Sequence, residues 1–216
     1  MPRRITQLLV GLFLYGIGIA FIVRGMIGAA PWDVLTQGIA RHVSLTFGVI
    51  TILVSIVVLL LWIPIRQKPG IGTVLNALLV GQAADVGFLL IPETDLLWVR
   101  ILFFVIGLLV LSGATGLYIG ASFGPGPRDG LMTGLHRRTG WPIWAVRTGL
   151  EVTVVAVGWA LGGNVGVGTV AFALLVGPLC QYFLRLFAIR LPEKATPEKA
   201  ESDTEATPTG EIRIAG

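Results

Sequence analysis

Two segments of the chain decide how it folds: residues 28–41, with the sequence GAAPWDVLTQGIAR, and residues 124–137, with the sequence GPGPRDGLMTGLHR. The second begins 96 residues after the first, and both carry glycine, proline, aspartate, leucine, glycine and arginine at matching positions. The same spacing aligns residues 70–81, GIGTVLNALLVG, with residues 166–177, GVGTVAFALLVG. Apolar composition alone aligns leucine and valine, but it does not hold glycine, proline, aspartate and arginine in one register. We interpret the match as an internal duplication.

The composition places both copies in a membrane. The chain is 54% hydrophobic and 13% charged, with a mean hydropathy of +0.83, whereas soluble domains carry about 25% charged residues. A domain of this size still exposes about a third of the surface of its unfolded chain, so a globular core cannot hide this excess. The composition therefore excludes a cytosolic globular enzyme, and we expect the lipid bilayer as the main partner. The net charge of +4 comes from basic residues beside hydrophobic runs, which are typical of membrane topology signals and not of a nucleic-acid partner.

Six apolar stretches predict membrane-spanning helices, each near the ~20 residues that a crossing needs. The predicted spans are Ile5–Arg24, Phe47–Ile65, Gly72–Ile91, Leu96–Gly116, Trp141–Leu161 and Gly166–Ala188. The fold class is therefore an all-α membrane protein. Lysine and arginine gather on the segments that share a side with the N-terminus, which indicates a cytoplasmic side. We expect a multi-pass protein of the bacterial inner membrane with both termini in the cytoplasm.

Each copy contains three predicted spans, so the second copy enters the membrane from the opposite face. We expect a first repeat over residues 1–95, a second over residues 96–190, and a disordered cytoplasmic tail over residues 191–216, which is polar and has little apolar mass to bury. Inverted repeats underlie many secondary transporters, whose sites lie near the midplane between the repeats. Dual-topology ancestors leave the same pattern in proteins that transport nothing, so the repeat alone does not decide the function.

Each Gly-Pro-Asp segment predicts a short amphipathic or re-entrant helix after the first span of its copy. Proline suits a first helical turn, and an aspartate two residues later favours the positive end of the helix. Helix capping is one role for the two aspartates. The other is a central site where both helix N-termini converge and, with Arg128, bind an anionic group. The candidate substrate-binding residues are Pro31, Trp32, Asp33, Pro127, Arg128 and Asp129.

These two segments, together with the size of the chain, resemble the YczE/YitT group of bacterial membrane proteins over about Ile5 to Arg190. The resemblance implies a hydrophobic multi-span body with a glycine-rich segment after the first span, and it implies no substrate. YitT-like members also carry a soluble C-terminal domain. Because this chain ends in a short polar tail, we expect it to belong to the YczE branch.

Charges inside the predicted spans cost roughly 2.5–3.5 kcal/mol each on insertion scales and need partners. Arg147 and Glu151 lie four residues apart and can pair on one helix face, where the first copy has Thr51 and Ser55. Asp85 has no cation within one helical turn, so it pairs with another helix or stays protonated. We consider two roles for Asp85, Arg147 and Glu151: structural pairing, or a charge relay in a proton-coupled carrier.

Two function classes remain. The leading hypothesis is secondary transport of a small solute or ion, with proton coupling as an option. The alternative is a non-transporting accessory or regulatory protein that binds other membrane helices through the glycine face of Gly116, Gly120 and Gly124; either function is compatible with a homodimer. We expect no enzyme, cofactor or metal, because no catalytic or phosphate-binding spacing is present and one cysteine with two histidines is too few for a metal centre.

Overall fold

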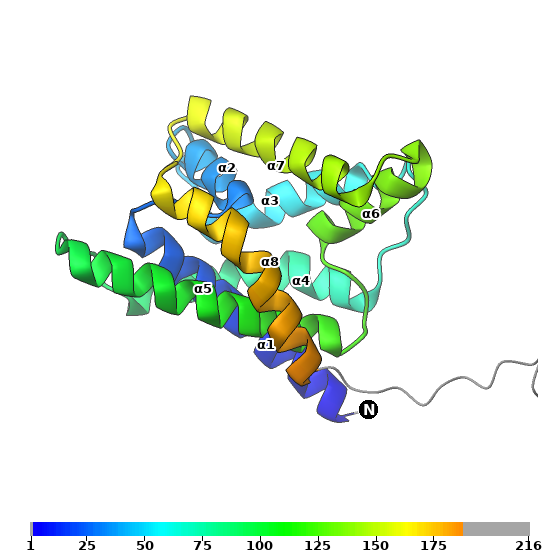
Figure 1. Cartoon of the computed structure of the whole chain (residues 1–216), viewed down its shortest axis with the longest axis horizontal. Coiled ribbons are helices and arrows are strands. Elements are labelled where there is room, and N and C mark those ends of the chain that lie inside the picture. The colour runs from blue at the N-terminus through cyan, green and yellow to red at the C-terminus, as the bar shows by residue number, and fades with distance from the viewer. Residues whose placement is uncertain (1, 188–216) are drawn as a thin grey trace, which may run out of the picture.

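The computed structural model describes residues 2–187 (Figure 1). The predicted tail over residues 191–216 lies outside the described residues. The described part is all helical, with the elements α1 (Pro2–Gly25), α2 (Pro31–Ala40), α3 (Phe47–Leu60), α4 (Ile71–Leu90), α5 (Leu97–Gly120), α6 (Pro127–Thr139), α7 (Ile143–Ala160) and α8 (Val167–Phe187). The helices α6, α7 and α8 each begin 96 residues after α2, α3 and α4, respectively.

Five helices, α1, α4, α5, α7 and α8, are long and apolar enough to cross a membrane. The predicted second span was too long, because α3 has only 14 residues, or about 21 Å of helix against a hydrocarbon core of ~30 Å. After Leu60 the chain turns through residues 61–66. Trp62 is buried by this turn, and its indole Nε1 donates a hydrogen bond to the Pro127 carbonyl at 3.1 Å. This buried contact ends α3 earlier than its apolar sequence suggests.

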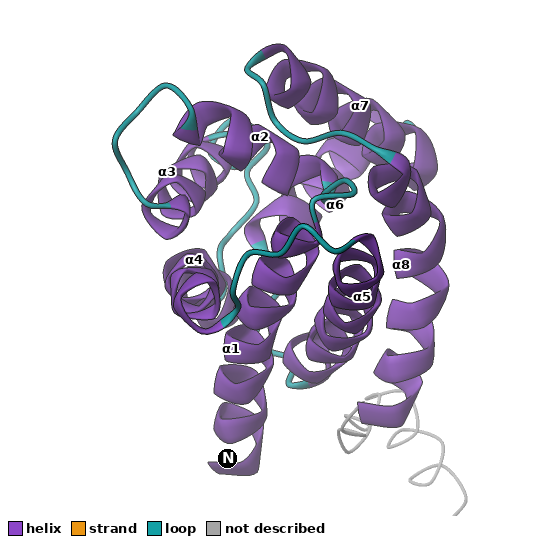
Figure 2. Cartoon of the chain, turned by 90° about the vertical axis from the view of Figure 1, so that its left-hand side faces the viewer, coloured by secondary structure: helices purple, strands orange, loops and turns teal. Residues whose placement is uncertain are grey.

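The helices form two layers (Figures 1 and 2). One layer contains α1, α4, α5 and α8, and the other contains α2, α3, α6 and α7. Each layer therefore takes two helices from each half of the described chain. On one side, α3 packs along α4 and joins the layers.

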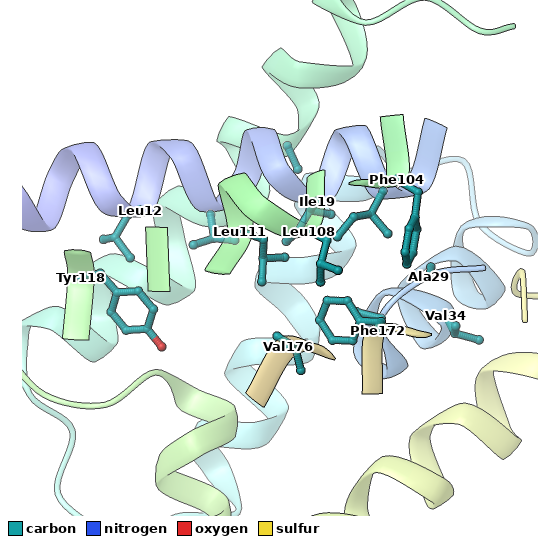
Figure 3. Packing of buried hydrophobic residues seen from close by; sticks show 14 of the residues in the cluster. Leu12, Ile19, Ala29, Val34, Phe104, Leu108, Leu111, Tyr118, Phe172 and Val176 are labelled. Carbon is teal, nitrogen blue, oxygen red and sulfur yellow. The ribbon is translucent and has the colours of Figure 1, made fainter. Parts of the chain in front are cut away.

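The core lies where α1 and α5 pack together. A Cβ atom added to Gly18 of α1 would lie 2.8 Å from the backbone nitrogen of Leu111, and one added to Gly107 of α5 would lie 2.8 Å from the Gly18 carbonyl oxygen. Small residues permit this approach, and close packing holds helices together in lipid. Around this contact, Figure 3 shows the side chains of Leu12, Ile19, Leu108, Leu111, Phe172 and Val176, drawn from α1, α5 and α8.

The two predicted short helices are present as α2 and α6. They begin at Pro31 and Pro127, where the missing proline N–H removes no helical hydrogen bond. Before them, Gly28 and Gly124 have φ angles of 129° and 115°, which only glycine adopts readily. The glycines that precede each proline therefore allow the chain to reverse direction after α1 and after α5.

Each of these reversals is held by the start of a helix from the other half of the chain. The Gly168 amide at the start of α8 donates to the Ile27 carbonyl at 2.8 Å, and the Gly72 amide at the start of α4 donates to the Phe123 carbonyl at 2.9 Å. Both donors and both acceptors are 96 residues apart. The same contact therefore occurs twice, once in each direction between the halves.

Candidate functional site

A cavity of about 300 Å³ lies between the two layers. Its walls come from α1, α5 and α8 in one layer and from α2, α6 and α7 in the other. A chamber of about 50 Å³ adjoins it, and Tyr15, Tyr118, Arg128 and Asp129 line both. The larger volume falls at the lower end of the range for small-molecule pockets.

The N-termini of α2 and α6 meet at this cavity. Trp32 and Arg128 are each the second residue of their helix, and the Arg128 guanidinium carbon lies 5.2 Å from the centre of the Trp32 ring. This distance is within the range of a cation–π contact. The predicted site residues Pro31, Trp32, Arg128 and Asp129 line the large cavity, and Pro127 lines the small chamber.

Arg128 has hydrogen-bond donors available for a ligand. Its side chain is 22% exposed, and the carboxylate oxygen paired with it, Oδ1 of Asp33, is 3.7 Å from Nη2, too long for a hydrogen bond. A guanidinium carries five N–H donors. Within residues 2–187, none of the hydrogen bonds formed by the protein uses one of them. The structure therefore directs an arginine with unused donors at the cavity.

The two matching aspartates have different surroundings. Asp33 is 1% exposed, and neither of its carboxylate oxygens accepts a hydrogen bond from a described residue. Burying a carboxylate in this way is costly, so the Arg128 charge and the positive end of α2 stabilise it. Asp129 instead accepts a hydrogen bond from the Tyr118 hydroxyl at 2.9 Å. Neither N-cap position of α2 or α6 has a side-chain cap.

Arg147 and Glu151 form the ion pair that their spacing predicts. The Arg147 Nε and Glu151 Oε1 atoms are 2.9 Å apart, and the two side chains are 48% and 28% exposed. Both residues also line the large cavity. The predicted pair therefore forms on the wall of the large cavity.

Asp85 lies apart from these residues and lines neither cavity. Its Oδ2 accepts a hydrogen bond from the Thr46 hydroxyl at 2.6 Å, and its Oδ1 accepts one from the Gly48 amide at 2.8 Å. Helix N-termini leave their first amides without partners. Asp85 of α4 therefore binds the N-terminus of α3, so its partners lie on another helix and are a hydroxyl and a backbone amide.

Sequence reasoning missed two tyrosines at the centre of the site. Tyr15 and Tyr118 line both cavities, and their rings meet edge to face with centroids 5.9 Å apart. A polar aromatic inside an otherwise apolar span is the signal that could have indicated them, because a buried hydroxyl needs a partner.

The glycine face of α5 packs inside the chain. A Cβ atom added to Gly116 would lie 2.7 Å from the carbonyl carbon of Phe183 in α8, and one added to Gly120 would lie 2.9 Å from the Phe187 carbonyl oxygen. This face is therefore already occupied. Metal-binding groups of three or more histidine, cysteine or acidic residues do not occur within residues 2–187.

Comparison with known proteins gives the family. The model of the family of unknown function DUF6198 matches residues 2–185. The chain is 39% identical to an uncharacterized protein of Haemophilus influenzae over 190 residues, which cover 88% of this chain and 87% of that protein. It is 31% identical to the uncharacterized membrane protein YczE of Bacillus subtilis over 183 residues, or 84% and 85% of the two chains.

A third relative is the uncharacterized protein YyaS of Bacillus subtilis, 26% identical over 182 residues, which cover 81% of this chain and 89% of that protein. No solved structure matches the chain. The resemblance to the YczE group is thereby confirmed. The chain belongs to the DUF6198 family, and it is a bacterial multi-pass membrane protein homologous to YczE.

Proposed function

We propose that this protein is a secondary transporter that binds the carboxylate group of a small organic solute at Arg128, between the N-termini of α2 and α6. The observation that carries the proposal is an arginine with unused donors, placed at a helix N-terminus inside a cavity of about 300 Å³. A guanidinium binds a carboxylate through two parallel hydrogen bonds. Backbone amides at a helix start add favourable interactions with negative charge.

The remaining walls suit the rest of such a solute. Trp32, Leu150 and Phe172 offer apolar surface, and Asp129 offers an acceptor for a hydroxyl or ammonium group. A small hydroxy acid or amino acid carries a carboxylate and a donor on a short carbon chain. We therefore assign the solute to that class.

The proposal includes an inverted arrangement of the two halves. It is supported by the 96-residue register, by the matching helix starts, and by the hydrogen bonds from Gly72 and Gly168 that link the halves reciprocally. With the N-terminus in the cytoplasm, as the basic residues favour, residues 41–46 face the outside and residues 140–142 face the cytoplasm. The site then lies between the repeats, as in other inverted-repeat carriers.

The accessory-protein alternative loses its main support, because Gly116 and Gly120 contact α8 of the same chain. We also propose that the protein is not an enzyme. The cavity holds ion pairs and hydroxyls, and its one cysteine has no histidine beside it among the lining residues, so a nucleophile with an activating base is not assembled there.

Uptake by reconstituted vesicles tests transport. Proteoliposomes containing the full chain are supplied with radiolabelled lactate, alanine or phosphate, with and without an imposed pH gradient. We expect uptake of lactate or alanine above that of protein-free vesicles, lost in Arg128→Gln and kept in the exposed-arginine control Arg66→Gln. Stimulation by the pH gradient would support proton coupling. Equal uptake by Arg128→Gln and the parent protein, or by protein-free vesicles, would contradict the proposal.

Labelling at matched loop positions tests the inversion. Single cysteines replace Val43 and Thr139, which are exposed and 96 residues apart, in a Cys180→Ser background. An impermeant maleimide applied to oriented membrane vesicles should react with Val43→Cys from the outside and with Thr139→Cys from the cytoplasmic side. Labelling of both from one face would exclude inversion.

A further inference from the structure

The two cavities are lined by matching residues of the two halves. Eight residues that line the small chamber lie 96 positions from residues that line the large cavity. One of the eight is Tyr15, which matches Leu111. The other seven are Thr51, Ser55, Asn76, Val80, Gly126, Pro127 and Arg128; in the same order, they match Arg147, Glu151, Phe172, Val176, Ala30, Pro31 and Trp32. The cavities are therefore two versions of one space: the version of about 300 Å³ is lined by α7 and α8, and the version of about 50 Å³ is lined by α3 and α4.

Near the small version, α3 and α4 are in direct contact. A Cβ atom added to Gly81 of α4 would lie 3.0 Å from the Cα atom of Gly48 in α3, so the two backbones touch. Asp85 of α4 then binds Thr46 and the Gly48 amide at the start of α3. We call this contact the α3–α4 seam; it consists of Thr46, Gly48, Gly81 and Asp85.

The large version is open at the corresponding place. Positions 48, 81 and 85 of the seam match Trp144, Gly177 and Gln181. Trp144 is 72% exposed, Gln181 is exposed, and a Cβ atom added to Gly177 would meet no other atom within 4 Å. The helices α7 and α8 make at most a minor contact, whereas α3 and α4 pack together.

We infer that this structure is one of two alternating states, and that Thr51, Ser55 and Asn76 line a second solute-accessible cavity that opens when α3 leaves α4 and α7 closes on α8. The inference rests on the proposed function, because it supplies the second side of the transport pathway. Rocking of one helix layer against the other around a fixed site is a general route to alternating access. Arg128 lines both cavities, and its contact with Trp32 is the pivot.

A contact that is present in this structure illustrates how α7 closes on α8 in the second state. Trp62 already packs directly on Gly130, which shows how an indole covers a glycine here. In the second state, Trp144 covers Gly177 in the same manner. Asp85 is the latch that opposes this change, because its two hydrogen bonds exist only while α3 stays on α4.

The labelling rates of two cysteines measure how accessible each cavity is. Cys180, the single cysteine of the chain, lines the large cavity, and Ser55→Cys in a Cys180→Ser background reports on the small chamber. An impermeant maleimide is applied from each side of oriented vesicles. We expect Cys180 to react from the cytoplasmic side and Ser55→Cys to react slowly from the outside.

Removal of the Asp85 side chain should change the labelling rates of Cys180 and Ser55→Cys in opposite directions. With Asp85→Ala we expect labelling of Ser55→Cys to accelerate about thirtyfold, the factor that the loss of two hydrogen bonds brings, and labelling of Cys180 to slow. Asp85→Asn keeps an acceptor for the Gly48 amide and should have a smaller effect. Asp95→Ala, which removes an exposed acidic group paired with Arg100, is the matched control and should change neither rate.

A bulky side chain in the large cavity, which we call the wedge, should have the reverse effect on the labelling of Ser55→Cys. Gly177→Trp fills the space that α7 must enter, so labelling of Ser55→Cys should slow. Gly149→Trp is the matched control, because Gly149 also has no atom within 4 Å of an added Cβ but lies on the exposed face of α7. The wedge does not touch the latch, so it tests alternation even if Asp85→Ala fails to fold.

The outcomes separate the two proposals. Alternation is overturned if the labelling rates of Cys180 and Ser55→Cys change in the same direction. It is also overturned if those rates respond equally to Gly177→Trp and Gly149→Trp. Uptake of lactate or alanine would then still support the binding site. Reciprocal rates without uptake of lactate, alanine or phosphate overturn transport and leave a two-state membrane protein.

Discussion

The two halves of the chain share a sequence register but differ in the packing of their matching helices α3 and α7. In the first half, α3 packs on α4 through Gly48 and Gly81. In the second half, α7 stands away from α8 and Trp144 is exposed. The contacts of α1 with α4 and of α5 with α8 are present in both halves. Within the other layer, α2 packs on α7 more extensively than α6 packs on α3. The halves therefore differ mainly in how α3 and α7 pack.

Another pair of contacts is preserved by exchange of large and small residues. Trp62 packs on Gly130, and the position that matches Trp62 is Gly158, where an added Cβ would lie 2.5 Å from the Leu35 amide. The position that matches Gly130 is Val34. A glycine thus permits a close approach at both contacts: the Trp62 side chain lies on Gly130, and the backbone of Val34 and Leu35 lies on Gly158.

The largest effect should follow from removing the Trp62 side of this exchange. Trp62→Ala deletes a fully buried indole and its hydrogen bond to the Pro127 carbonyl, and we expect the free energy of unfolding to fall by about 3–5 kcal/mol. Denaturant unfolding in detergent measures it. Trp98→Ala, at a side chain that is 82% exposed, is the control, and equal losses for both would contradict the packing.

The next effect compares the matching residues Trp32 and Arg128 at the pivot. Arg128→Gln removes charge-assisted hydrogen bonds, so the lactate or alanine concentration that protects Cys180 from maleimide should rise about 10- to 150-fold. Trp32→Leu removes only a cation–π and apolar contact, and we expect about a two- to fivefold rise. Equal shifts would mean that charge does not direct binding.

The 96-residue sequence match made the short helices predictable, and it indicated most of the residues that line the candidate site. Pro31 and Pro127 are found at the first helical position, and five of the six predicted binding residues line a cavity. Asp33 does not line it, because its carboxylate lies behind Arg128. Duplicated polar residues in an apolar chain carry information that single apolar runs do not.

The packing between layers could not be predicted. A helix that is apolar on all sides does not indicate which face meets a neighbour, so the end of α3 and the seam between α3 and α4 were not foreseen. The role of Asp85 depends on a hydroxyl and a backbone amide of another helix. Backbone partners leave no trace in a search for opposite charges.

A smaller effect separates two glycines on the same helix. Gly116 lies against the α8 backbone, whereas an added Cβ at Gly113 would be 3.8 Å from the Phe183 ring. We expect Gly116→Leu to lower the free energy of unfolding by about 1–3 kcal/mol through overpacking, and Gly113→Leu to lower it less. Unfolding in detergent measures both. A stable Gly116→Leu protein would restore the accessory-protein alternative, in which that face binds a partner.

The smallest stability effect should come from the ion pair that only the second half contains. Arg147 and Glu151 are 48% and 28% exposed, and exposed pairs four residues apart contribute about 0.3–0.5 kcal/mol. Glu151→Gln should therefore leave unfolding in detergent almost unchanged. If the pair is part of a proton path, the same variant should abolish the stimulation of uptake by a pH gradient. A large loss of stability with unchanged coupling would instead make the pair a structural substitute for Thr51 and Ser55, and the asymmetry between the halves would then concern folding and not transport.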